Sequence, residues 1–566
     1  MNLELALQPD PSRLTWSRLC ADACARHTDR TAFRFQGESW RYSRLADEVQ
    51  SFAAALLARG VGRGTHVALL MANRPEWAVA SFAVASLGAV VIPVNTFATP
   101  RERDYILRHA DAALLIVQSQ LLKHRFIDDL VDAHPEIATA KPGALRCAAL
   151  PQLRRLIALG PHGLLDAREA RGAIEAWPET AAPSAGDARL LDAIEAELDP
   201  SDDGFIIYTS GTTALPKAIL HPQQSAAIQS YRFAEYLGHT PDDVVYTAQP
   251  FFWTAGIAQS LGATLAAGAR LVLAESFEPG EALALIEAER VTCPLAWPHQ
   301  DKAMAEHPEA AQRDLSSARK VEFASPLGKL VGLEKDEWGM YGSYGLSETF
   351  TIASAIPCTA PAELRAKTSG VALPGMELRI VDPMTGEPTD GHGEITVRGA
   401  TLMRGYYKQP REAAFDAAGF FHTQDGGEID DTGYLHWTGR LSNLIKTGGA
   451  NVSPLEIDHA ALDIPGVQAA LAVGVPHPQL GEAIVLCALR SEGHAPDASE
   501  VRRVLRERLA AYKVPKLVLF FEASEIEFTG NQKIQLGPLR EAALARLARE
   551  GIEIDGHPYE SPERNE

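Results

Sequence analysis

Cysteine is scarce in this 566-residue chain, and its six cysteines are scattered along the sequence. Their spacing matches neither a disulfide framework nor a zinc site. Cys20 and Cys24 stand four residues apart in a segment that we predict to be helical, so two buried thiols are expected there. The N-terminus, MNLELALQPDPSR, also lacks the basic start and apolar core of a secretory signal. These absences predict a cytoplasmic protein.

Long apolar runs are also scarce. The uncharged stretch WAVASFAVASLGAVVIPV, residues 77–94, is nearly long enough to span a bilayer. It breaks at Gly88, becomes rich in β-branched residues and stops at Pro93. A buried helix that leads into a buried strand explains this pattern better than a membrane span.

Basic residues are too few to balance the acidic ones, with 53 Lys and Arg against 73 Asp and Glu, a formal net charge of −20. The electrostatic field of such a negatively charged protein repels nucleic acids and anionic membrane surfaces, so we expect neither as a partner. An anionic ligand would therefore need a local positive site. The hydrophobic content of 46% supplies ample core, and the length predicts two or more domains.

What the chain does contain is a regular alternation of helical and strand-like segments from about residue 40, which predicts a parallel sheet covered by helices. Residues from about 119 to 200 are rich in Ala, Arg and Leu, and we interpret them as helices with a surface linker at AAPSAGDA. Short β patterns with turns follow after about residue 370. From Leu441 the pattern changes to that of a small α+β unit.

A hydroxyl-rich loop follows one of the predicted strands. In YTSGTTALPKAILHP, the strand-like DDGFIIYTS leads into SGTT, and Gly211 permits close backbone approach. Lys217 adds a positive charge. Converging donors after a strand, with a lysine nearby, suit phosphate oxygens, although the spacing is not that of the Walker loop. A polar surface turn is the alternative for this loop taken alone. The hydroxyl donors are Thr209, Ser210, Thr212 and Thr213.

Two later motifs add groups that a nucleotide needs. YGSYGLSET places an aromatic ring, a hydroxyl and a carboxylate together at Tyr344, Ser347 and Glu348. A ring can flank a base, a serine can donate to phosphate, and a glutamate can ligate magnesium. FHTQDGGEIDDTGYLHWTGR then contains Asp425 and Arg440, and a carboxylate can accept hydrogen bonds from the vicinal hydroxyls of a ribose.

Two further motifs, LIKTGGANVSPLEI and FTGNQKIQLGPLR with Lys533, complete the series. Each motif alone is explained as ordinary surface charge. Together and in this order they resemble the adenylate-forming superfamily of acyl-CoA synthetases, luciferases and peptide-synthetase adenylation domains. The resemblance runs from NRPEWAVASFAVASLGAVVIPVN to KIQLGPLR. It implies an α/β fold with a large N-terminal domain of packed sheets and helices, including a small β-rich subdomain (1–440), and a small mobile α+β domain (441–566).

The resemblance also implies a role for each motif. The loop from Thr209 to Lys217 would close over the β- and γ-phosphates of ATP. In the YGLSE motif, Tyr344 would stack on the adenine, Ser347 would contact the α-phosphate, and Glu348 would ligate magnesium. Asp425 would hold the ribose, with Arg440 nearby.

The C-terminal motifs would act in turn. Lys533 matches the lysine that bridges the acid and the α-phosphate. After adenylation the small domain would rotate about a joint near Ser442 and present KTGGANVSP to coenzyme A. Gly448 and Gly449 would then let the backbone approach the pantetheine arm, because neither has a Cβ atom.

The acid pocket is predicted from QPFFWTAGI, where Trp253 stands at the place of a bulky aromatic in the family. Phe252 and Ser325 are further candidates for contact with the acid. Phe251 and Trp297 add aromatic bulk, which favours a short, medium-length or aryl acid. Ordinary core packing remains an equal explanation for all these aromatics except Trp253.

The chain departs from the family at four positions where glycine is preferred, which are Ala214, Ala218, Gln424 and Gln532. It also carries Ser442 where relatives often have Asp or Lys. A side chain at a glycine position reduces loop freedom, or strains the backbone where φ is positive. These departures point to an unusual substrate more than to a loss of ATP binding.

Three functions fit this pattern. The first is an AMP-forming acid–CoA ligase that uses ATP, Mg²⁺ and coenzyme A. The second keeps adenylation but changes the acceptor, to a carrier protein or an amine, or changes the acid, for example to nitrite activated for diazo formation. The third is a nucleotide-binding protein without catalysis. Coenzyme A is favoured over a carrier because no phosphopantetheine-bearing segment follows Lys533, and a homodimer is left open.

Overall fold

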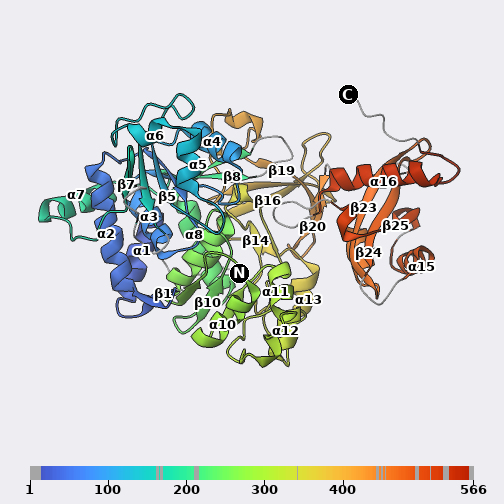
Figure 1. Cartoon of the computed structure of the whole chain (residues 1–566). Helices are drawn as coiled ribbons and strands as arrows, with labels where there is room; N and C mark the ends of the chain where they lie inside the picture. Colours follow the sequence, from blue (N-terminus) through green and yellow to red (C-terminus); the bar gives the residue numbers. More distant parts are fainter. Residues whose placement is uncertain are drawn as a thin grey trace. The chain divides into compact units, whose positions relative to one another are not determined.

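Figure 1 shows the computed structural model of the chain. It describes residues 14–160, 165, 170–209, 216–340, 342–441, 445–447, 450–452, 454–490, 496–509, 511–526 and 534–559. The chain divides into two compact units. The first comprises Met1–Leu378, Val397–Phe421 and Asp431–Leu435, and the second comprises Arg379–Thr396, His422–Asp430 and His436–Glu566. The division into domains 1–440 and 441–566 stays a prediction.

The larger sheet of the first unit has eight strands in the order β18-β9-β8-β4-β3-β5-β6-β7. From β8 to β7 neighbouring strands run parallel, whereas β9 is antiparallel to both β8 and β18. The parallel part confirms the expected helix-covered sheet. In sheet order the strands are Gly405–Tyr406, Lys217–Pro222, Asp203–Thr209, Val90–Pro93, His66–Leu70, Leu114–Gln118, Arg155–Leu159 and Ile174–Ala176.

The uncharged run at residues 77–94 forms a helix and a strand, as predicted. All residues of α3 (Pro75–Ser86) from Trp77 to Ala85 are buried, and so is the whole of β4. Gly88 turns the chain between them with a φ of +67°. Within the described residues, no helix is both long and apolar enough to cross a bilayer.

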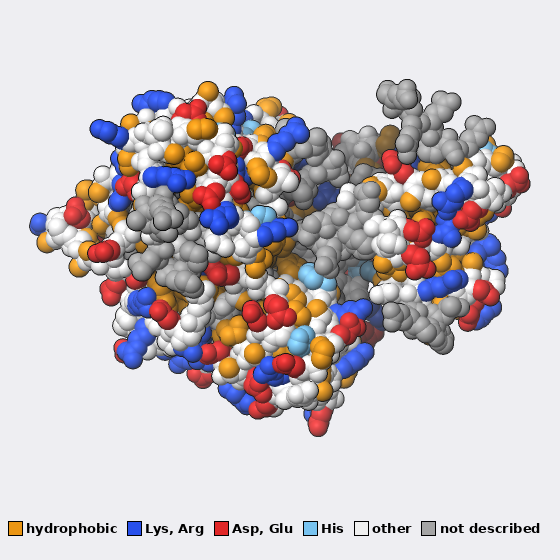
Figure 2. Space-filling model, in the orientation of Figure 1, with side chains coloured by type: hydrophobic (Ala, Val, Ile, Leu, Met, Phe, Trp, Pro, Cys, Tyr) orange, Lys and Arg blue, Asp and Glu red, His pale blue; other side chains and the backbone are white. Residues whose placement is uncertain are grey.

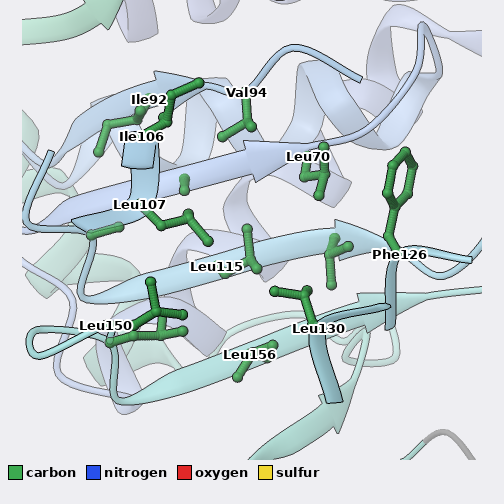
Figure 3. Close-up of a cluster of buried hydrophobic side chains, with 14 of the residues drawn as sticks. Leu70, Ile92, Val94, Ile106, Leu107, Leu115, Phe126, Leu130, Leu150 and Leu156 are labelled. Carbon is green, nitrogen blue, oxygen red and sulfur yellow. The ribbon is translucent and has the colours of Figure 1, made fainter. Parts of the chain in front are cut away.

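The larger sheet is buried on both faces, which explains why its strands are almost continuously apolar. On the face drawn in Figure 3, alternate residues of adjacent strands form one cluster, for example Leu70, Ile92 and Leu115. Helices α4 (Pro100–His109) and α5 (Phe126–Ala133) cover it, contributing Ile106, Leu107, Phe126 and Leu130. Each buried aliphatic side chain of this size contributes about 1.5–3 kcal/mol.

The interpretation of residues 119–200 as helices is wrong in part. Helices α5, α6 (Glu136–Thr139) and α7 (Ala185–Ala196) are present, but β6 and β7 extend the sheet. A short apolar run such as LIAL in β6 fits a helix or a strand, and only its pairing with β5 decides between them. Only the first half of the expected linker AAPSAGDA is irregular, because α7 begins at Ala185, where the Ser184 side chain caps it by accepting from the Asp187 N–H.

The second sheet of this unit has the order β12-β10-β11-β1-β2 and is parallel except for the β1–β2 hairpin. Helices link the two sheets into one core. Helix α8 (Gln223–Tyr236) contacts β8 and β9, α9 (Ala263–Ala266) contacts β11, and the two helices contact each other and α1 (Trp16–Arg26). The strands are Cys293–Leu295, Val244–Thr247, Arg270–Leu273, Thr31–Phe35 and Glu38–Arg41.

The remaining elements of the first unit lie around these sheets. A small antiparallel sheet joins β13 (Ser343–Tyr344), β14 (Ser354–Ala355) and β15 (Val371–Ala372). Cys20 and Cys24 are buried in α1, as predicted, with their sulfur atoms 3.9 Å apart. The other helical segments are α2 (Tyr42–Ala58), η2 (Gly256–Gly262), α10 (Pro279–Glu289), α11 (Pro298–Ala305), η3 (Ala310–Gln312), α12 (Pro326–Val331), η4 (Ser347–Thr349), α13 (Ala362–Lys367) and η5 (Arg411–Ala413).

The second unit contains the expected α+β pattern. Its C-terminal sheet has the order β22-β21-β24-β23, with β25 parallel to β24. Helices α14 and α15 pack on one face of this sheet and α16 packs on the other. These elements are β21 (Ile445–Thr447), β22 (Ala450–Val452), α14 (Pro454–Leu462), β23 (Val467–His477), β24 (Gly481–Arg490), α15 (Ala498–Arg508), η7 (Ala511–Lys513), β25 (Leu517–Phe521), η8 (Ala523–Glu525) and α16 (Leu536–Glu550).

Acidic and basic side chains are mixed over the face of the molecule that Figure 2 shows, so the negative net charge is not gathered into one patch there.

A further sheet has the order β16-β17-β19-β20. Its strands are Met376–Val381, Gly393–Gly399, Phe421–Ile429 and Leu435–Arg440, and β18 follows β17 in the chain.

Strand β19 holds a left-handed residue at one of the positions where the resembled family prefers glycine. Gln424 has a φ of +61°, which costs a residue with a side chain about 1–2 kcal/mol. Its N–H donates to Glu394 Oε1 at 2.8 Å, and His422 Nδ1 contacts the other oxygen of that carboxylate at 2.8 Å. Ala218 differs, because it lies in β9 opposite Tyr208 without a positive φ. Ala214, Ser442 and Gln532 lie outside the described residues.

We expect Gln424→Gly to leave the free energy of unfolding unchanged or to raise it, because glycine adopts this φ without strain. Gln424→Val should lower it by about 1–2 kcal/mol, since a β-branched side chain is disfavoured there. Urea denaturation measures both effects. Glu428→Val is the control on the same strand, exposed and with an ordinary φ, and it should be neutral. Equal stability of the two Gln424 variants would contradict the left-handed backbone.

Candidate active site

The predicted phosphate loop connects β8 to β9. Thr209 ends β8, Lys217 begins β9, and the two residues pair across the antiparallel ladder. This pairing brings the two ends of the loop together and leaves the Lys217 side chain exposed. Ser210, Gly211, Thr212 and Thr213 lie outside the described residues, so their phosphate contacts stay a prediction.

The YGLSE motif forms a strand end followed by a single 3₁₀ turn. Tyr344 closes β13 with its side chain buried, and η4 begins at Ser347. Ser347 and Glu348 are half-buried. The structure thus brings the three predicted residues into one compact turn. Stacking of Tyr344 on a base stays a prediction.

The turn that carries Glu348 is strained. Phe350 has a φ of +53°, and the β-branched Thr351 has a φ of +108°. A Cβ atom at Gly345 would lie 1.8 Å from the Thr351 carbonyl oxygen, so only glycine fits there. Backbone strain of this kind persists only where surrounding contacts enforce it, and it is common at functional sites.

Two buried side chains enforce this conformation. Gln229 of α8 donates from Nε2 to the carbonyls of Thr349 and Ile352, at 2.8 and 2.6 Å. His221 of β9 contacts the Ser347 carbonyl through Nε2 at 2.8 Å. Burial lowers the pKa of His221 to about 3, so the ring is neutral and Nε2 carries the donated proton.

Lys217 and Glu348 meet through a third residue, Tyr406. The Tyr406 hydroxyl donates to Glu348 Oε1 at 2.8 Å, and Lys217 Nζ lies 5.1 Å from the centre of the Tyr406 ring. The Met403 N–H also donates to the Glu348 carbonyl at 2.8 Å. An ammonium and a carboxylate from different motifs are therefore held beside one phenol ring.

The sequence pattern did not single out Tyr406, His221 or Gln229. Each acts on the Glu348 turn from more than fifty positions away in the chain, so local periodicity carries no sign of it. A doublet of tyrosines in RGYYK is visible, but only the structure separates the roles of its two members.

In the second unit, Asp425 and Arg440 form the predicted pair. Arg440 Nε lies 2.9 Å from Asp425 Oδ1, and Arg440 Nη1 donates to the Thr423 carbonyl at 2.9 Å. The Asp425 N–H donates to Thr423 Oγ1 at 3.1 Å. Asp425 is buried, whereas Arg440 is exposed.

The predicted pocket aromatics form a row of edge-to-face contacts. Phe252 contacts Trp253 with ring centres 5.1 Å apart, and Trp253 contacts Trp297 at 6.3 Å. The exposed ring of Phe97 contacts Phe252 at 5.6 Å. Phe252 is buried, whereas both tryptophans are partly exposed. Phe251 instead packs against Trp77 in the core, with ring centres 5.3 Å apart.

A buried amide fixes the segment that carries these aromatics. Asn73 Nδ2 donates to the Gln249 carbonyl at 2.8 Å, and Asn73 Oδ1 accepts from the Phe251 N–H at 2.9 Å. Ser325 has a different visible contact: its hydroxyl donates to Asp301 Oδ1 at 2.9 Å and caps α12 by accepting from the Gly328 N–H. Contact of Ser325 with the acid stays a prediction.

The remaining predicted residues, Lys533, Gly448 and Gly449, lie outside the described residues. Their assignment to the acid, the α-phosphate and coenzyme A rests on the motifs alone. The neighbouring strands β21 and β22, which flank the two glycines, form a hairpin in which Thr447 pairs with Ala450.

Known proteins match nearly the whole chain. Models described as AMP-binding enzyme and AMP-binding enzyme C-terminal domain match residues 20–407 and 456–533. The chain is 30% identical over 532 residues to an indoleacetate–CoA ligase of Aromatoleum aromaticum, which covers 92% of this chain and 96% of the relative.

Solved structures are similar to it as well. ATP-bound MatB from Rhodopseudomonas palustris has a TM-score of 0.72 at 26% identity, covering 93% of this chain and 98% of its own. The amide bond synthetase McbA from Marinactinospora thermotolerans has a TM-score of 0.73 at 25% identity, covering 93% and 99%. The chain therefore belongs to the AMP-binding enzyme family, that of the AMP-forming acid–CoA ligases.

Proposed function

We propose that this enzyme activates a carboxylic acid with ATP and passes the acyl group to coenzyme A. The acid carboxylate attacks the α-phosphorus of ATP, and the bond to pyrophosphate breaks. The thiolate of coenzyme A then attacks the acyl carbon, and AMP leaves. The observation that carries this proposal is the meeting of Lys217 and Glu348 at one tyrosine beside the hydroxyl-rich loop.

Charge neutralisation and positioning are what such a reaction needs from a protein. We assign Lys217 to the β- and γ-phosphates, because its ammonium is exposed at the base of the loop. Ser347 contacts the α-phosphate, and Tyr344 flanks the adenine. Asp425 accepts from the ribose hydroxyls, with Arg440 holding its carboxylate in place at 2.9 Å.

The donor set also fits Mg²⁺. Across the described ranges, no group of three or more His, Cys, Asp and Glu side chains could hold a metal by itself. Mg²⁺ is commonly held by one or two carboxylates together with substrate phosphates. Glu348 is half-buried and supplies such a carboxylate. The ion would neutralise phosphate charge in a protein whose own net charge is −20.

The aromatic row favours an aryl or a short acid. Trp253 and Trp297 present partly exposed rings at right angles to each other, which suits a flat or narrow acyl group. The similarity to an indoleacetate–CoA ligase supports an aryl acid.

A second candidate function keeps the adenylation and changes the acceptor. The fold is similar to that of an amide bond synthetase, which supports an amine as the acceptor in place of coenzyme A. A nucleotide-binding protein without catalysis is a weaker candidate, because Lys217, Glu348 and Asp425 are all present.

With a panel of short, medium-length and aryl acids, we expect acid-dependent exchange of labelled pyrophosphate into ATP, and thioester formation once coenzyme A is added. Glu348→Gln should lower the exchange at least about 100-fold, since it removes a charged contact of the reacting site. Glu387→Gln, at an exposed glutamate of a hairpin, is the control and should retain full exchange. Binding of ATP without exchange for any acid would favour the non-catalytic alternative, and product with amines only would favour the second function.

Trp253→Ala should shift the preference among acids toward longer ones, because it removes bulk from the pocket. One methylene in an apolar site is worth roughly 1–3 kcal/mol, so ratios of kcat/KM should change about 10-fold or more. Trp437→Ala, at an exposed tryptophan of β20, is the matched control. An unchanged order of preference would remove Trp253 from the pocket.

Lys533→Ala should abolish adenylation but spare thioester formation from supplied acyl-adenylate, because the resemblance assigns this lysine to the first step only. Gly449→Leu should do the reverse, since added bulk would block the pantetheine arm. Separate assays of the two half-reactions measure this, with Lys335→Ala, at an exposed lysine, as control. Equal loss in both half-reactions would argue against separate arrangements for the two steps.

A further inference from the structure

A two-residue strand pairs with the strand that begins at Lys217 and contacts the Glu348 turn. Strand β18, Gly405–Tyr406, pairs with Leu220 and Ile219 of β9, the strand that begins at Lys217. Hydrogen bonds continue the pairing on both sides, because the Arg404 N–H donates to the Leu220 carbonyl and the Tyr407 N–H donates to the Ala218 carbonyl, each at 2.8 Å. The backbone of this segment is therefore fixed to the strand that carries Lys217.

Consecutive residues of an extended strand point to opposite faces, and the two tyrosines do so here. Tyr406 packs with the hydrophobic cluster that contains Ile219, Met403 and Leu346. Tyr407 packs instead against the large cluster on the other face of the sheet. The same residue type thus meets two different environments one position apart.

On its face, Tyr406 makes two polar contacts at once. Its hydroxyl donates to Glu348 Oε1 at 2.8 Å, while its ring faces Lys217 Nζ at 5.1 Å. A hydrogen bond to an ionised carboxylate is among the stronger ones, and a cation over a phenol ring is attracted to it. The Met403 N–H anchors the same turn through the Glu348 carbonyl.

On the other face, Tyr407 is engaged in a separate group. Its hydroxyl donates to Asp111 Oδ2 at 2.9 Å, and Lys408 Nζ lies 2.7 Å from the same oxygen. Burial and this hydrogen bond raise the pKa of Tyr407 to about 12. Tyr407 therefore has the same phenol-to-carboxylate contact as Tyr406, but away from the assigned site residues.

We propose that Tyr406 is a positioning residue for metal-dependent ATP binding. Its hydroxyl holds the Glu348 carboxylate through one oxygen and so fixes the orientation of the group assigned to Mg²⁺. Its ring keeps the Lys217 ammonium beside that carboxylate. The inference rests on the proposed function, since that function assigns Glu348 and Lys217 to Mg²⁺ and phosphate.

The two contacts can be removed separately. Tyr406→Phe deletes the hydroxyl and keeps the ring, so it should weaken the binding of Mg²⁺ while nucleotide binding without metal is unchanged. Loss of a hydrogen bond to a charged group should raise the Mg²⁺ concentration for half-maximal binding about tenfold. Tyr406→Leu deletes the ring as well and should further weaken metal-free binding two- to fivefold.

The experiment titrates α,β-methylene-ATP into the full-length protein by calorimetry, over a series of Mg²⁺ concentrations. Tyr407→Phe is the matched control, because it deletes the same hydroxyl from a phenol-to-carboxylate contact on the opposite face. This variant should leave unchanged both the Mg²⁺ concentration for half-maximal binding and the affinity for the nucleotide without metal. Thermal denaturation of each variant confirms that it is folded, and the linewidth of bound Mn²⁺ in electron paramagnetic resonance gives a second measure of the metal.

A double-mutant cycle separates positioning from general support of the turn. In the Glu348→Gln background, Tyr406→Phe should have no further effect on the dependence on Mg²⁺. An unchanged Mg²⁺ constant in Tyr406→Phe, or an equal change in Tyr407→Phe, would overturn the inference while the proposed function stands. A wild-type protein that binds no nucleotide at any Mg²⁺ concentration would overturn both.

Discussion

A buried guanidinium, that of Arg74, connects the two sheets on which the first unit is built. It lies between β3 of the larger sheet and α3, and its Nη1 is 3.2 Å from Oε1 of Glu275, which follows β11 of the smaller sheet. Glu76 lies 3.0 Å from its Nε, so the buried positive charge is matched by two carboxylates. Gln118, at the end of β5, donates to the same Glu275 oxygen at 2.7 Å. The ends of three strands are therefore held in one polar group.

This constraint reaches the aromatic row of Phe252, Trp253 and Trp297 through the preceding residue, Asn73. Asn73 follows the same strand, and its side-chain amide donates to the Gln249 carbonyl and accepts from the Phe251 N–H. The segment that carries Phe252 and Trp253 is thus held by a side-chain amide that follows a strand of the larger sheet, in addition to the contacts among its own rings. Support of this kind holds side chains in a defined geometry.

Local patterns in the sequence were sufficient for part of this architecture. The run at residues 77–94 and the strand that precedes the phosphate loop carry their own periodicity, and the ordered motifs predicted which residues gather at the Glu348 turn. The strands β6 and β7 could not be predicted, because pairing with β5 decides them. His221, Gln229 and Tyr406 were missed for the same reason, since their partners are distant in sequence. The left-handed backbone at Gln424 depends on Glu394, thirty residues earlier.

The tyrosine doublet of β18 has a consequence for strand register. A slip of one residue in a strand exchanges the side chains on its two faces, which normally ruins any site that depends on them. Here a slip in one direction would put Tyr407 in the place of Tyr406 but Lys408 in the place of Tyr407, and a slip in the other direction would put Gly405 in the place of Tyr406. A one-residue insertion or deletion ahead of this edge strand would therefore remove at least one of the two phenol-to-carboxylate contacts, so the pair of tyrosines requires a fixed length of the chain that leads into it.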